Sequence, residues 1–355
     1  MIKQTKIKLL IVGPDSPHIA NFVNRFDTNT YNLQVISSGK RHITCKNNLR
    51  VNFSLIKFWN FLFTPLKIKK IAHQFEPDVV WLHQANSFSL YPILALKKKY
   101  PIILTVWGSD ILVAPKKTWW IRRMTRYILS KVDLITADAK FLGEQAIELS
   151  PKANIPLHIC QFGINPIDIS PEKEKVIFSN RGHKSLYRIN EVILAFHRFQ
   201  SNSTANEWKL VIAGEGPETL GLQKLVDELK LTEKVQFVGF LSAFENANWY
   251  SRSTYYISIP ESDGTAVSLL EAMYYGCIPI VSDLPANKEW IHHSENGYVV
   301  SDLKENFLAE AMKMNCSTAI ATNKALINKT ATPEACTQKF EEAIEAVLFI
   351  KKETI

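Results

Sequence analysis

Residues Ile259 to Asp283 read IPESDGTAVSLLEAMYYGCIPIVSD, and this stretch decides the fold. The apolar run Tyr255–Pro260 predicts a strand that ends at a proline, and Gly264 permits a tight turn after it. A helix follows, because apolar residues recur at helical spacing, and then a second apolar run, Cys277–Asp283. Strand, turn, helix and strand in this order form the repeating unit of a parallel sheet covered by helices. The stripe of the helix that should face the core consists of Val267, Leu270, Met273 and Tyr274.

Two carboxylates frame this turn and helix. Asp263 precedes the glycine, and Glu271 lies on the polar face of the helix, one turn beyond Ser268. A helix that begins near Gly264 directs free N–H groups and the positive end of its dipole toward the turn, which suits a phosphate. Glu271 could then bind ribose hydroxyls while Asp263 meets another hydroxylated group. The alternative is an ordinary helix, in which Asp263 is an N-cap and Glu271 is solvated. The motif alone leaves both readings open.

The same alternation of apolar runs and helix-period segments extends through the chain and predicts two doubly wound α/β lobes, residues 1–165 and residues 166–338. Residues 164–175, with two prolines and several charges, are the expected linker. Ligands of such folds bind at the carboxyl ends of the strands, so the cleft between the lobes is the expected site. A last helix, at about 340–355, is expected to pack back on the first lobe.

The predicted strands are 6–13, 33–37, 78–83, 101–108, 133–137, 157–163, 175–181, 208–217, 234–240 and 254–260, and the predicted helices include 18–26, 58–75, 90–100, 118–131, 189–200 and 220–230.

Composition limits the class of protein. A chain of 355 residues with 46% hydrophobic and 21% charged residues is long enough for two globular lobes. No run of about 18 apolar residues predicts a membrane-spanning helix, and the N-terminus enters a strand directly instead of forming a signal peptide. The five cysteines have no paired spacing, which argues against a disulfide framework and against a zinc site. A reducing cytoplasm is therefore the expected location.

Charge is divided unequally along the chain. Residues 1–165 hold 23 Lys and Arg against 9 Asp and Glu, whereas the remainder is mildly acidic. Basic and aromatic residues interleave in Ile56–Gln74 and in Lys116–Lys131, which include Trp119 and Trp120. These segments predict a surface that rests on anionic lipid, and the alternative is a core-facing aromatic stripe with basic residues reaching to solvent.

The opening stretch resembles a known family. SDGTAVSLLEAMYYGCIPIVSD is similar to the acid-x7-Glu signature of the retaining nucleotide-sugar glycosyltransferases of family 4, which have the two-Rossmann GT-B fold. The resemblance implies that Asp263 contacts the donor sugar and that Glu271 binds the ribose. It also implies that the backbone of Gly264, Thr265 and Ala266 reaches the sugar and phosphate. The first acidic residue is usually Glu in that family, and here it is the shorter Asp.

Other donor-side residues follow from the same resemblance. In SNRGHKSLYR, which ends at Arg188, the family's cationic pair falls on Arg181 and Lys184, with Arg188 as the alternative to Lys184. A departing diphosphate needs such fixed positive charge in a site without a metal ion. The loop LVIAGEGPE places Gly214 near the nucleotide, and the turn around Gly239 corresponds to the backbone that reads the base edge.

The acceptor side is expected in the first lobe. VGPDSPHIANF places Gly13 and His18 after the first strand, WLHQANS places His83 after another, and VWGSDIL places Asp110 after a third. The family usually has a second glycine in the first of these loops. It also often has a histidine where Trp107 stands, so no catalytic histidine role transfers there. A lone His83 is more often a buried imidazole than a catalyst.

Several motifs are missing. The chain has no DxD pair for a divalent ion on a diphosphate, no phosphate-binding Walker loop and no G-x-S-x-G elbow. Metal independence is therefore expected, with no cofactor, and a serine hydrolase lacks its nucleophile.

The resemblance implies a retaining, hexosyl-type glycosyltransferase (EC 2.4). Its donor is expected to be a UDP-sugar, with a GDP-sugar possible, and its acceptor a lipid-linked or cell-surface glycan of polysaccharide or lipopolysaccharide biosynthesis. The enzyme would be cytoplasmic and peripheral on the inner face of the membrane. Two alternatives stay open: a sugar-nucleotide epimerase of the same fold, and a nucleic-acid-binding protein. No nucleic acid is expected as a partner, because no recognition motif accompanies the basic charge.

Overall fold

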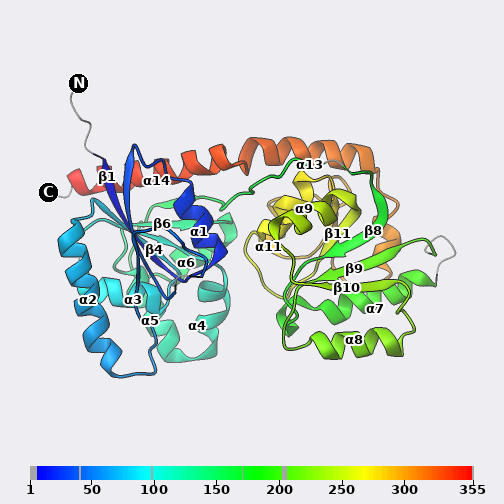
Figure 1. Ribbon diagram of the computed structural model, residues 1–355, viewed down its shortest axis with the longest axis horizontal. Coiled ribbons are helices and arrows are strands. Elements are labelled where there is room, and N and C mark those ends of the chain that lie inside the picture. The colour runs from blue at the N-terminus through cyan, green and yellow to red at the C-terminus, as the bar shows by residue number, and fades with distance from the viewer. Residues whose placement is uncertain (1–5, 40, 97–98, 170, 202–205, 354–355) are drawn as a thin grey trace. The chain divides into compact units, whose positions relative to one another are not determined.

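The computed structural model describes residues 6–39, 41–96, 99–169, 171–201 and 206–353. The chain forms two compact units (Figure 1). Unit 1 contains residues 1–162 together with 333–355, and unit 2 contains residues 163–332. The two doubly wound α/β lobes predicted from the sequence are confirmed.

Unit 1 contains a seven-stranded parallel sheet in the order β3-β2-β1-β4-β5-β6-β7. Four of its strands, β1, β4, β5 and β6, are almost wholly buried, because helices cover both faces of the sheet. The strands are β1 (Ile7–Gly13), β2 (Tyr31–Ser37), β3 (Asn48–Arg50), β4 (Val79–His83), β5 (Ile102–Thr105), β6 (Leu134–Ala137) and β7 (Leu157–Ile159).

The helices of unit 1 form two layers. Helices α2, α3, α5 and α6 pack in series along one face, and α14 packs on strands β4 to β7 beside α1, where Phe22 and Phe340 meet. The last helix of the chain therefore belongs to the first unit. The helices are α1 (Pro17–Asn24), α2 (Trp59–Phe75), α3 (Ser87–Leu96), the π-helical turn η1 (Ser109–Val113), α4 (Ala114–Lys117), α5 (Trp119–Leu129), α6 (Lys140–Leu149) and α14 (Pro333–Glu353).

Unit 2 contains a six-stranded parallel sheet in the order β10-β9-β8-β11-β12-β13. One apolar core lies under α7, α8 and α12, and a second lies under α9, α10 and α13. The strands are β8 (Glu174–Ser179), β9 (Lys209–Ala213), β10 (Val235–Gly239), β11 (Ser253–Ser258), β12 (Ile278–Ser282) and β13 (Tyr298–Val300). The helices are the 3-10 turn η2 (Ser185–Tyr187), α7 (Ile189–Gln200), α8 (Thr219–Glu228), α9 (Ala243–Arg252), α10 (Val267–Tyr274), α11 (Pro285–Lys288), α12 (Phe307–Ala311) and α13 (Cys316–Thr330).

The expected linker is anchored in unit 2. Ile164 is buried in the core of this unit, and its N–H donates to the Ala331 carbonyl over 3.0 Å. Ile167 exchanges two hydrogen bonds with the Tyr275 hydroxyl, and Glu174 already belongs to β8. Residue 170 of this segment, and residues 97–98 of the helix predicted at 90–100, lie outside the described residues. The units therefore divide after Phe162 and again before Pro333, a few residues from the expected positions.

The remaining differences are elements that were not predicted. The sequence-based prediction did not include β3, β13, α6, α9, α11, α12 or α13. The strands β3 and β13 have three residues each and lie at the edges of their sheets. Three residues are too few to form the apolar run by which a buried strand is recognised in a sequence.

Candidate active site

Four loops of unit 2 leave the same edge of its sheet. They follow β8, β9, β10 and β11, which are neighbours in the sheet, so their carboxyl ends are adjacent. The Gly214 N–H donates to the Gly239 carbonyl over 2.7 Å, and the Glu261 N–H donates to the Leu186 carbonyl over 2.9 Å. These bonds join the loops into one rim.

Two glycines allow the loops after β8 and β9 to touch. Gly214 has φ +103°, and a Cβ there would lie 2.5 Å from the Arg181 carbonyl oxygen. A Cβ on Gly216 would lie 2.3 Å from the His183 carbonyl oxygen. The backbone that carries Arg181 therefore packs directly on the loop after β9, an approach that only glycine permits.

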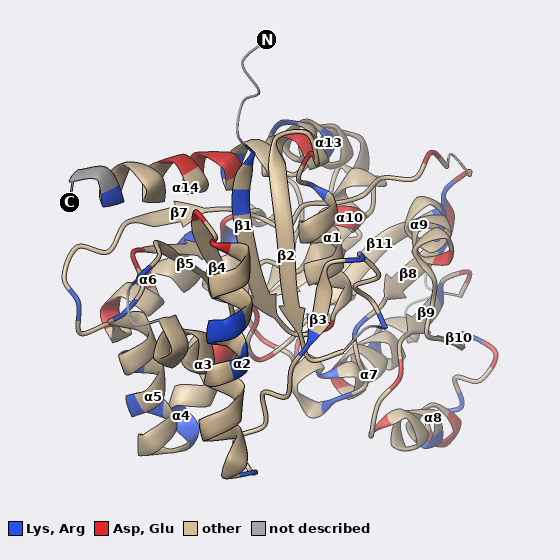
Figure 2. Ribbon diagram, turned by 60° about the vertical axis from the view of Figure 1, so that its left-hand side comes forward, with Lys and Arg blue, Asp and Glu red and all other residues tan. Residues whose placement is uncertain are grey.

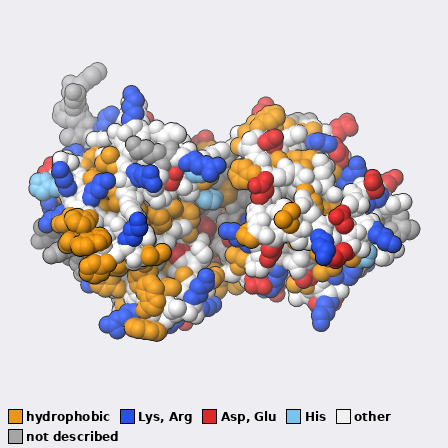
Figure 3. All heavy atoms as spheres, turned by 60° about the horizontal axis from the view of Figure 1, so that its bottom comes forward, with side chains coloured by type: hydrophobic (Ala, Val, Ile, Leu, Met, Phe, Trp, Pro, Cys, Tyr) orange, Lys and Arg blue, Asp and Glu red, His pale blue; other side chains and the backbone are white. Residues whose placement is uncertain are grey.

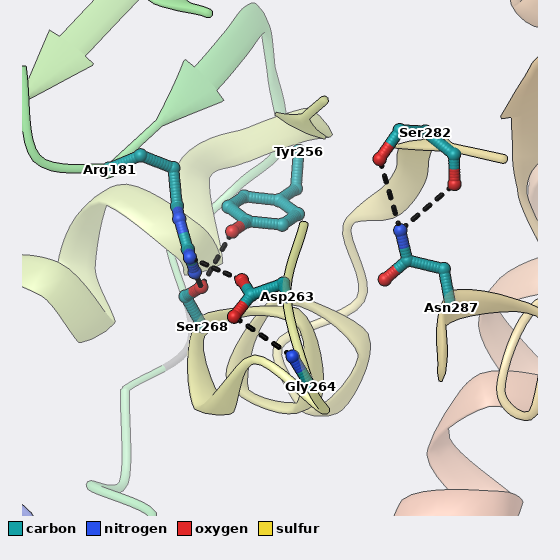
Figure 4. A network of polar contacts seen from close by, with 7 residues as sticks. All are labelled: Arg181, Tyr256, Asp263, Gly264, Ser268, Ser282 and Asn287. Carbon is teal, nitrogen blue, oxygen red and sulfur yellow. Dashed lines mark hydrogen bonds and ion pairs between the residues drawn. The ribbon is translucent and has the colours of Figure 1, made fainter. Parts of the chain in front are cut away.

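Arg181 is the centre of a polar network (Figure 4). Its Nη2 pairs with the Asp263 carboxylate, and its Nη1 donates to the Ser268 hydroxyl over 2.9 Å. Ser268 and the Tyr256 hydroxyl are 2.7 Å apart, and the guanidinium lies 4.5 Å from the centroid of the Tyr187 ring. A charged, planar donor group is thus fixed at the rim of the sheet.

The charge on Arg181 is maintained despite burial. Only 11% of the side chain is exposed, and burial disfavours the charged form. The Asp263 carboxylate, together with the nearby Tyr256, Tyr187 and Tyr250, more than offsets this effect and holds the pKa of the guanidinium above its ordinary value. A second oxygen of Asp263, Oδ1, accepts the Gly264 N–H over 3.1 Å.

The turn before α10 differs from the expectation in one respect. The helix begins at Val267, not near Gly264, and its N-cap is Ala266 with no side-chain hydrogen bond. Asp263 is therefore not a helix N-cap. A hydrogen bond to a more distant residue also stabilises the turn, because the Trp290 indole N–H donates to the Thr265 hydroxyl over 3.2 Å.

Glu271 is not a solvated helix residue. Burial raises the pKa of its carboxyl to about 7, although a hydrogen bond with the Tyr250 hydroxyl opposes the shift. Asn180, which follows β8, donates to the same Tyr250 hydroxyl over 2.6 Å. The expected core stripe of α10 needs correction, since the buried residues of the helix are Leu269, Leu270, Ala272 and Met273, whereas Val267 and Tyr274 are only half-buried.

The two other cations of the loop after β8 differ from Arg181. Lys184 is exposed and immediately precedes η2. Arg188 has φ +51° and pairs with Glu261 over 3.3 Å. Lys184 and Arg188 therefore lie on the same loop as Arg181 but outside its network.

In unit 1, His83 lies inside an aromatic cluster. Its ring contacts Phe22 at 4.7 Å and Trp107 at 6.2 Å between centroids, and it stacks on Trp81. The side chain is fully buried, and burial lowers its pKa to about 3. Neither ring nitrogen has a partner among the described residues. His83 is thus a neutral core imidazole in this structure. It is buried, as the alternative to a catalytic role expected, but its nitrogens are not hydrogen-bonded to any described residue.

The other acceptor-side residues also surround this cluster. A Cβ on Gly13 would meet Ile19 at 3.0 Å and His83 at 3.1 Å, so the end of β1 is closely packed. His18 is exposed and contacts the Trp107 ring edge-on at 5.5 Å.

Asp110 is buried and has a structural role in this structure. Its carboxylate accepts the N–H groups of Ala85 (2.6 Å) and Trp107 (2.9 Å). Burial raises its pKa, although these N–H groups oppose the shift. Asp110 therefore ties together the loops after β4 and β5.

Some residues of the unit 2 network were not predicted. Tyr187 of η2 and Asn180 of the loop after β8 lie inside the stretch SNRGHKSLYR but were given no role there, whereas Tyr250 of α9 and Tyr256 of β11 stand in no motif. The signal available was weak: Tyr256 and Tyr250 are hydroxylated residues within apolar segments.

Within the described ranges, none of the helices combines the length and apolar character that crossing a bilayer requires. Nor do the described residues contain a group of three or more His, Cys, Asp or Glu side chains placed to hold a metal ion. All five cysteines are free thiols.

Two family models match the chain. "Glycosyl transferases group 1" matches residues 164–330, and "Glycosyl transferase 4-like" matches residues 7–139. The first match contains the whole rim of unit 2, and the second contains nearly all strands of unit 1.

Curated relatives and solved structures agree with the models. N-acetyl-alpha-D-glucosaminyl L-malate synthase of Bacillus anthracis is 25% identical over 254 residues, which are 66% of this chain and span 64% of the relative's length. A Campylobacter jejuni N-acetylgalactosaminyltransferase, whose name includes a diphospho-undecaprenol acceptor, is 22% identical over 83% of this chain and 82% of its own. Anabaena HepE, solved with UDP-glucose, superposes with a TM-score of 0.78 over 96% of this chain and 100% of its own, at 14% identity.

Proposed function

The chain belongs to the glycosyltransferases of the family 4 type with the GT-B fold, and from that premise we propose that it transfers a sugar from a nucleoside-diphosphate sugar to a hydroxyl group with retention of configuration. One observation carries the proposal: Arg181, Asp263 and the turn before α10 form one hydrogen-bonded network at the carboxyl edge of the unit 2 sheet.

Each group of this network has a task in binding the donor. Arg181 binds the diphosphate, and Lys184, which is exposed and lies outside the network on the same loop, adds a second cation. The backbone of Gly264 to Ala266 contacts the sugar and phosphate. Glu271 accepts hydrogen bonds from the ribose hydroxyls, and Gly239 lies in the turn beside the base.

The chemistry requires no side-chain nucleophile. The acceptor hydroxyl attacks the anomeric carbon on the face from which the diphosphate departs. One C–O bond forms, the bond to the diphosphate oxygen breaks, and the acceptor proton passes to that oxygen. Arg181 stabilises the negative charge that develops on the leaving group, which is where fixed donors lower a barrier most. The reaction is proposed to need no metal ion.

Asp263 has two partners in turn. In the structure it pairs with Arg181. A donor diphosphate would compete for the same guanidinium, and the carboxylate released from that pair would be free to accept a hydroxyl of the donor sugar.

The donor is proposed to be a UDP-sugar, and the acceptor a glycan or lipid-linked intermediate. Two findings support this choice: HepE binds UDP-glucose, and the Campylobacter relative is named for a diphospho-undecaprenol acceptor. The chain spans less than two thirds of the Bacillus relative, so that protein's own substrates are not carried over.

Unit 1 is proposed to rest on an anionic membrane surface. Segment 56–66 exposes several large apolar side chains, among them Phe58 (78% exposed) and Trp59 (67%). Trp119, 76% exposed, continues this apolar surface on α5. Figure 3 shows the hydrophobic side chains gathered on this side of unit 1, with Lys and Arg around them. Residues 51–75 and 111–132 contain no Asp or Glu, so the charge suits an anionic bilayer.

The donor proposal is tested by thermal stability in the presence of UDP-, GDP-, ADP- and dTDP-sugars, with and without EDTA. A ligand present at about 100 times its Kd raises the free energy of unfolding by about 2.7 kcal/mol. We expect a shift with UDP-sugars that EDTA leaves unchanged. No shift with any nucleotide sugar would contradict the donor site.

Two further readouts separate the alternatives. Retention is checked by NMR of the anomeric proton of the product, and an inverted anomer would overturn the mechanism. Conversion of the donor sugar without any acceptor would identify an epimerase instead.

The membrane proposal has its own test. Phe58→Ser with Trp59→Ser should abolish sedimentation with vesicles that contain phosphatidylglycerol. The matched control is Leu220→Ser with Phe244→Ser, which removes two equally exposed apolar side chains, 81% and 62%, from unit 2. Equal sedimentation of both double variants would contradict the proposed surface.

A further inference from the structure

Unit 1 has a cavity of about 390 Å³ at the carboxyl ends of β2 and β3. None of the residues assigned above to donor or acceptor binding lines it. One wall is the segment that follows β3, and the other is the start of α3. Its lining consists of Ser38, Arg50, Val51, Asn52, Phe53, Ser54, Ser87 and Phe88.

The wall that follows β3 is an extended segment with alternating sides. Val51 and Phe53 are buried, at 3% and 4% exposure, whereas Arg50 and Asn52 are exposed and Ser54 is half-buried. This period of two is that of a strand, so one set of side chains is packed and the other is available to a ligand.

The backbone of this segment is fixed by α2 and α3. Lys67 Nζ donates to the Arg50 carbonyl over 2.9 Å, and Thr64 Oγ1 donates to the Asn52 carbonyl over 2.8 Å. The Ser54 carbonyl accepts from Asn60 Nδ2 over 2.7 Å and from Tyr91 Oη over 3.0 Å. The backbone of this wall is therefore fixed by hydrogen bonds, and binding would not have to order it.

The lining combines three kinds of group. Arg50 supplies positive charge, and no acidic side chain pairs with it in the part of the chain that the structure describes. Lys67 is held at the Arg50 carbonyl, which adds a second cation nearby. Serine hydroxyls and the Asn52 amide offer hydrogen bonds, and Phe53 and Phe88, 4.7 Å apart, form an apolar wall. Such a set suits a phosphate group attached to a partly apolar molecule.

The exposed apolar surface begins a few residues after the cavity wall that follows β3. Ile56, which is 95% exposed, is two residues beyond Ser54, and Phe58 is four residues beyond. Since a chain advances by at most about 3.6 Å per residue, the polar cavity and the apolar side chains lie within the length of one lipid. A ligand that fills both must be anionic at one end and hydrocarbon at the other.

We propose that this cavity binds the phosphate or diphosphate of a lipid-linked acceptor, with the hydrocarbon chain along the exposed face of α2. Arg50 contacts the phosphate oxygens, and Ser54 and Ser87 donate to them. This inference rests on the proposed transferase function, since it assigns the acceptor class of that reaction. The residues that bind the donor are not involved.

The experiment measures binding of farnesyl diphosphate by calorimetry, with farnesol and inorganic diphosphate as the two halves of the probe. We expect wild-type protein to bind farnesyl diphosphate more tightly than either half. Arg50→Gln should weaken that binding about tenfold or more, the scale of a charged hydrogen bond. Ser87→Ala should weaken it by a smaller factor, and Lys46→Gln, which removes an exposed charge of unit 1 outside the cavity, should leave it unchanged.

Two comparisons make the test decisive. UDP binding should be the same in Arg50→Gln and wild type, which shows that the variant is folded and separates this inference from the donor proposal. Arg181→Gln should not change farnesyl diphosphate binding. The inference is overturned if Arg50→Gln binds the probe as tightly as wild type, if Arg181→Gln abolishes binding, or if farnesol binds as tightly as the diphosphate.

Discussion

The carboxyl edges of the two sheets are built alike, from loops that follow parallel strands, but they carry different side chains. The edge of unit 2 is polar and charged, whereas the edge of unit 1 is aromatic. In unit 2 the loops after β8 and β11 bring a guanidinium, a carboxylate and hydroxyl groups into one hydrogen-bonded network. In unit 1 the corresponding edge carries aromatic rings around His83, whose nitrogens have no partner among the described residues. Charge also differs between helices, with basic residues on α2 and α5 of unit 1 and acidic residues on α8 of unit 2, although α14 of unit 1 is acidic as well (Figure 2).

The comparison teaches that the fold supplies positions and the side chains supply the reaction. A nucleotide diphosphate is a polyanion, and under the proposed function the unit 2 edge would meet it with the buried guanidinium of Arg181, which pairs with the Asp263 carboxylate. At the edge of unit 1 aromatic rings pack around His83, and the polar cavity beside Arg50, proposed above as a phosphate site, is lined by other residues.

The largest effect is expected for Arg181→Ala. Losing a fixed donor to the developing charge should lower kcat/KM by about 100-fold or more. Arg252 is the matched control, because it also pairs with a carboxylate (Glu174, 2.7 Å) and lies over an aromatic ring (Trp249, 4.9 Å), but at the amino end of β11. Arg252→Ala should keep kcat/KM within about twofold. Similar losses in both variants would show that a paired arginine matters for stability alone.

Next comes the pH dependence of donor binding through Glu271. A carboxyl with pKa about 7 becomes protonated as pH falls from about 8 to about 6, and it then accepts ribose hydroxyls less well. Affinity for UDP-glucose, measured by calorimetry, should fall over that range in wild type. Glu271→Gln should bind about tenfold more weakly at the upper pH and show no dependence.

The same group affects stability with the opposite sign. Its pKa is raised on folding, so the unfolded chain ionises first and stability falls as pH rises from about 4.5 to about 7. Glu271→Gln should remove this fall. A wild-type affinity that does not change with pH would contradict the ribose role.

Glycines at the two edges should differ in their tolerance of a methyl group. Gly214→Ala meets backbone at 2.5 Å with φ +103°, so we expect unfolding free energy to fall by about 2–3 kcal/mol. Gly13→Ala meets side-chain atoms at 3.0 Å and should cost about 1 kcal/mol. Gly221 lies inside α8, and a Cβ there would have no atom within 4 Å. Gly221→Ala should therefore raise the free energy of unfolding by about 0.5–1 kcal/mol. Urea denaturation ranks the three, and a Gly13 variant less stable than the Gly214 variant would reverse the comparison.

The smallest effect is expected for His83→Phe. A phenyl ring can occupy the aromatic cluster without a polar atom, so stability near pH 7 should change by less than about 1.5 kcal/mol. In wild type the pKa of about 3 lies below the ordinary 6.5, so the unfolded chain binds a proton first and stability is lost as pH falls below about 6.5.

Thermal melts of wild type and His83→Phe between about pH 4 and 7 measure how much stability is lost as pH falls. This loss should be smaller in the variant. Turnover should be unchanged within about threefold. A 100-fold loss of turnover in a folded His83→Phe protein would establish a catalytic imidazole and end the contrast between the two edges.

The sequence by itself determined the two α/β lobes and the donor motif. Alternating apolar runs and helices, and the turn around Gly264 between a strand and a helix, are local patterns, and local patterns are what a sequence displays directly. The placement of Asp263 and Glu271 on one strand–helix unit followed from spacing alone.

Only the tertiary structure decided what those residues touch. The pairing of Arg181 with Asp263 joins residues 82 positions apart, and Glu271 forms a hydrogen bond with Tyr250 from another helix. The cavity beside Arg50 depends on carbonyl groups held by α2 and α3. Burial, charge pairing and cavity shape arise from contacts between distant segments, so no window of sequence contains them.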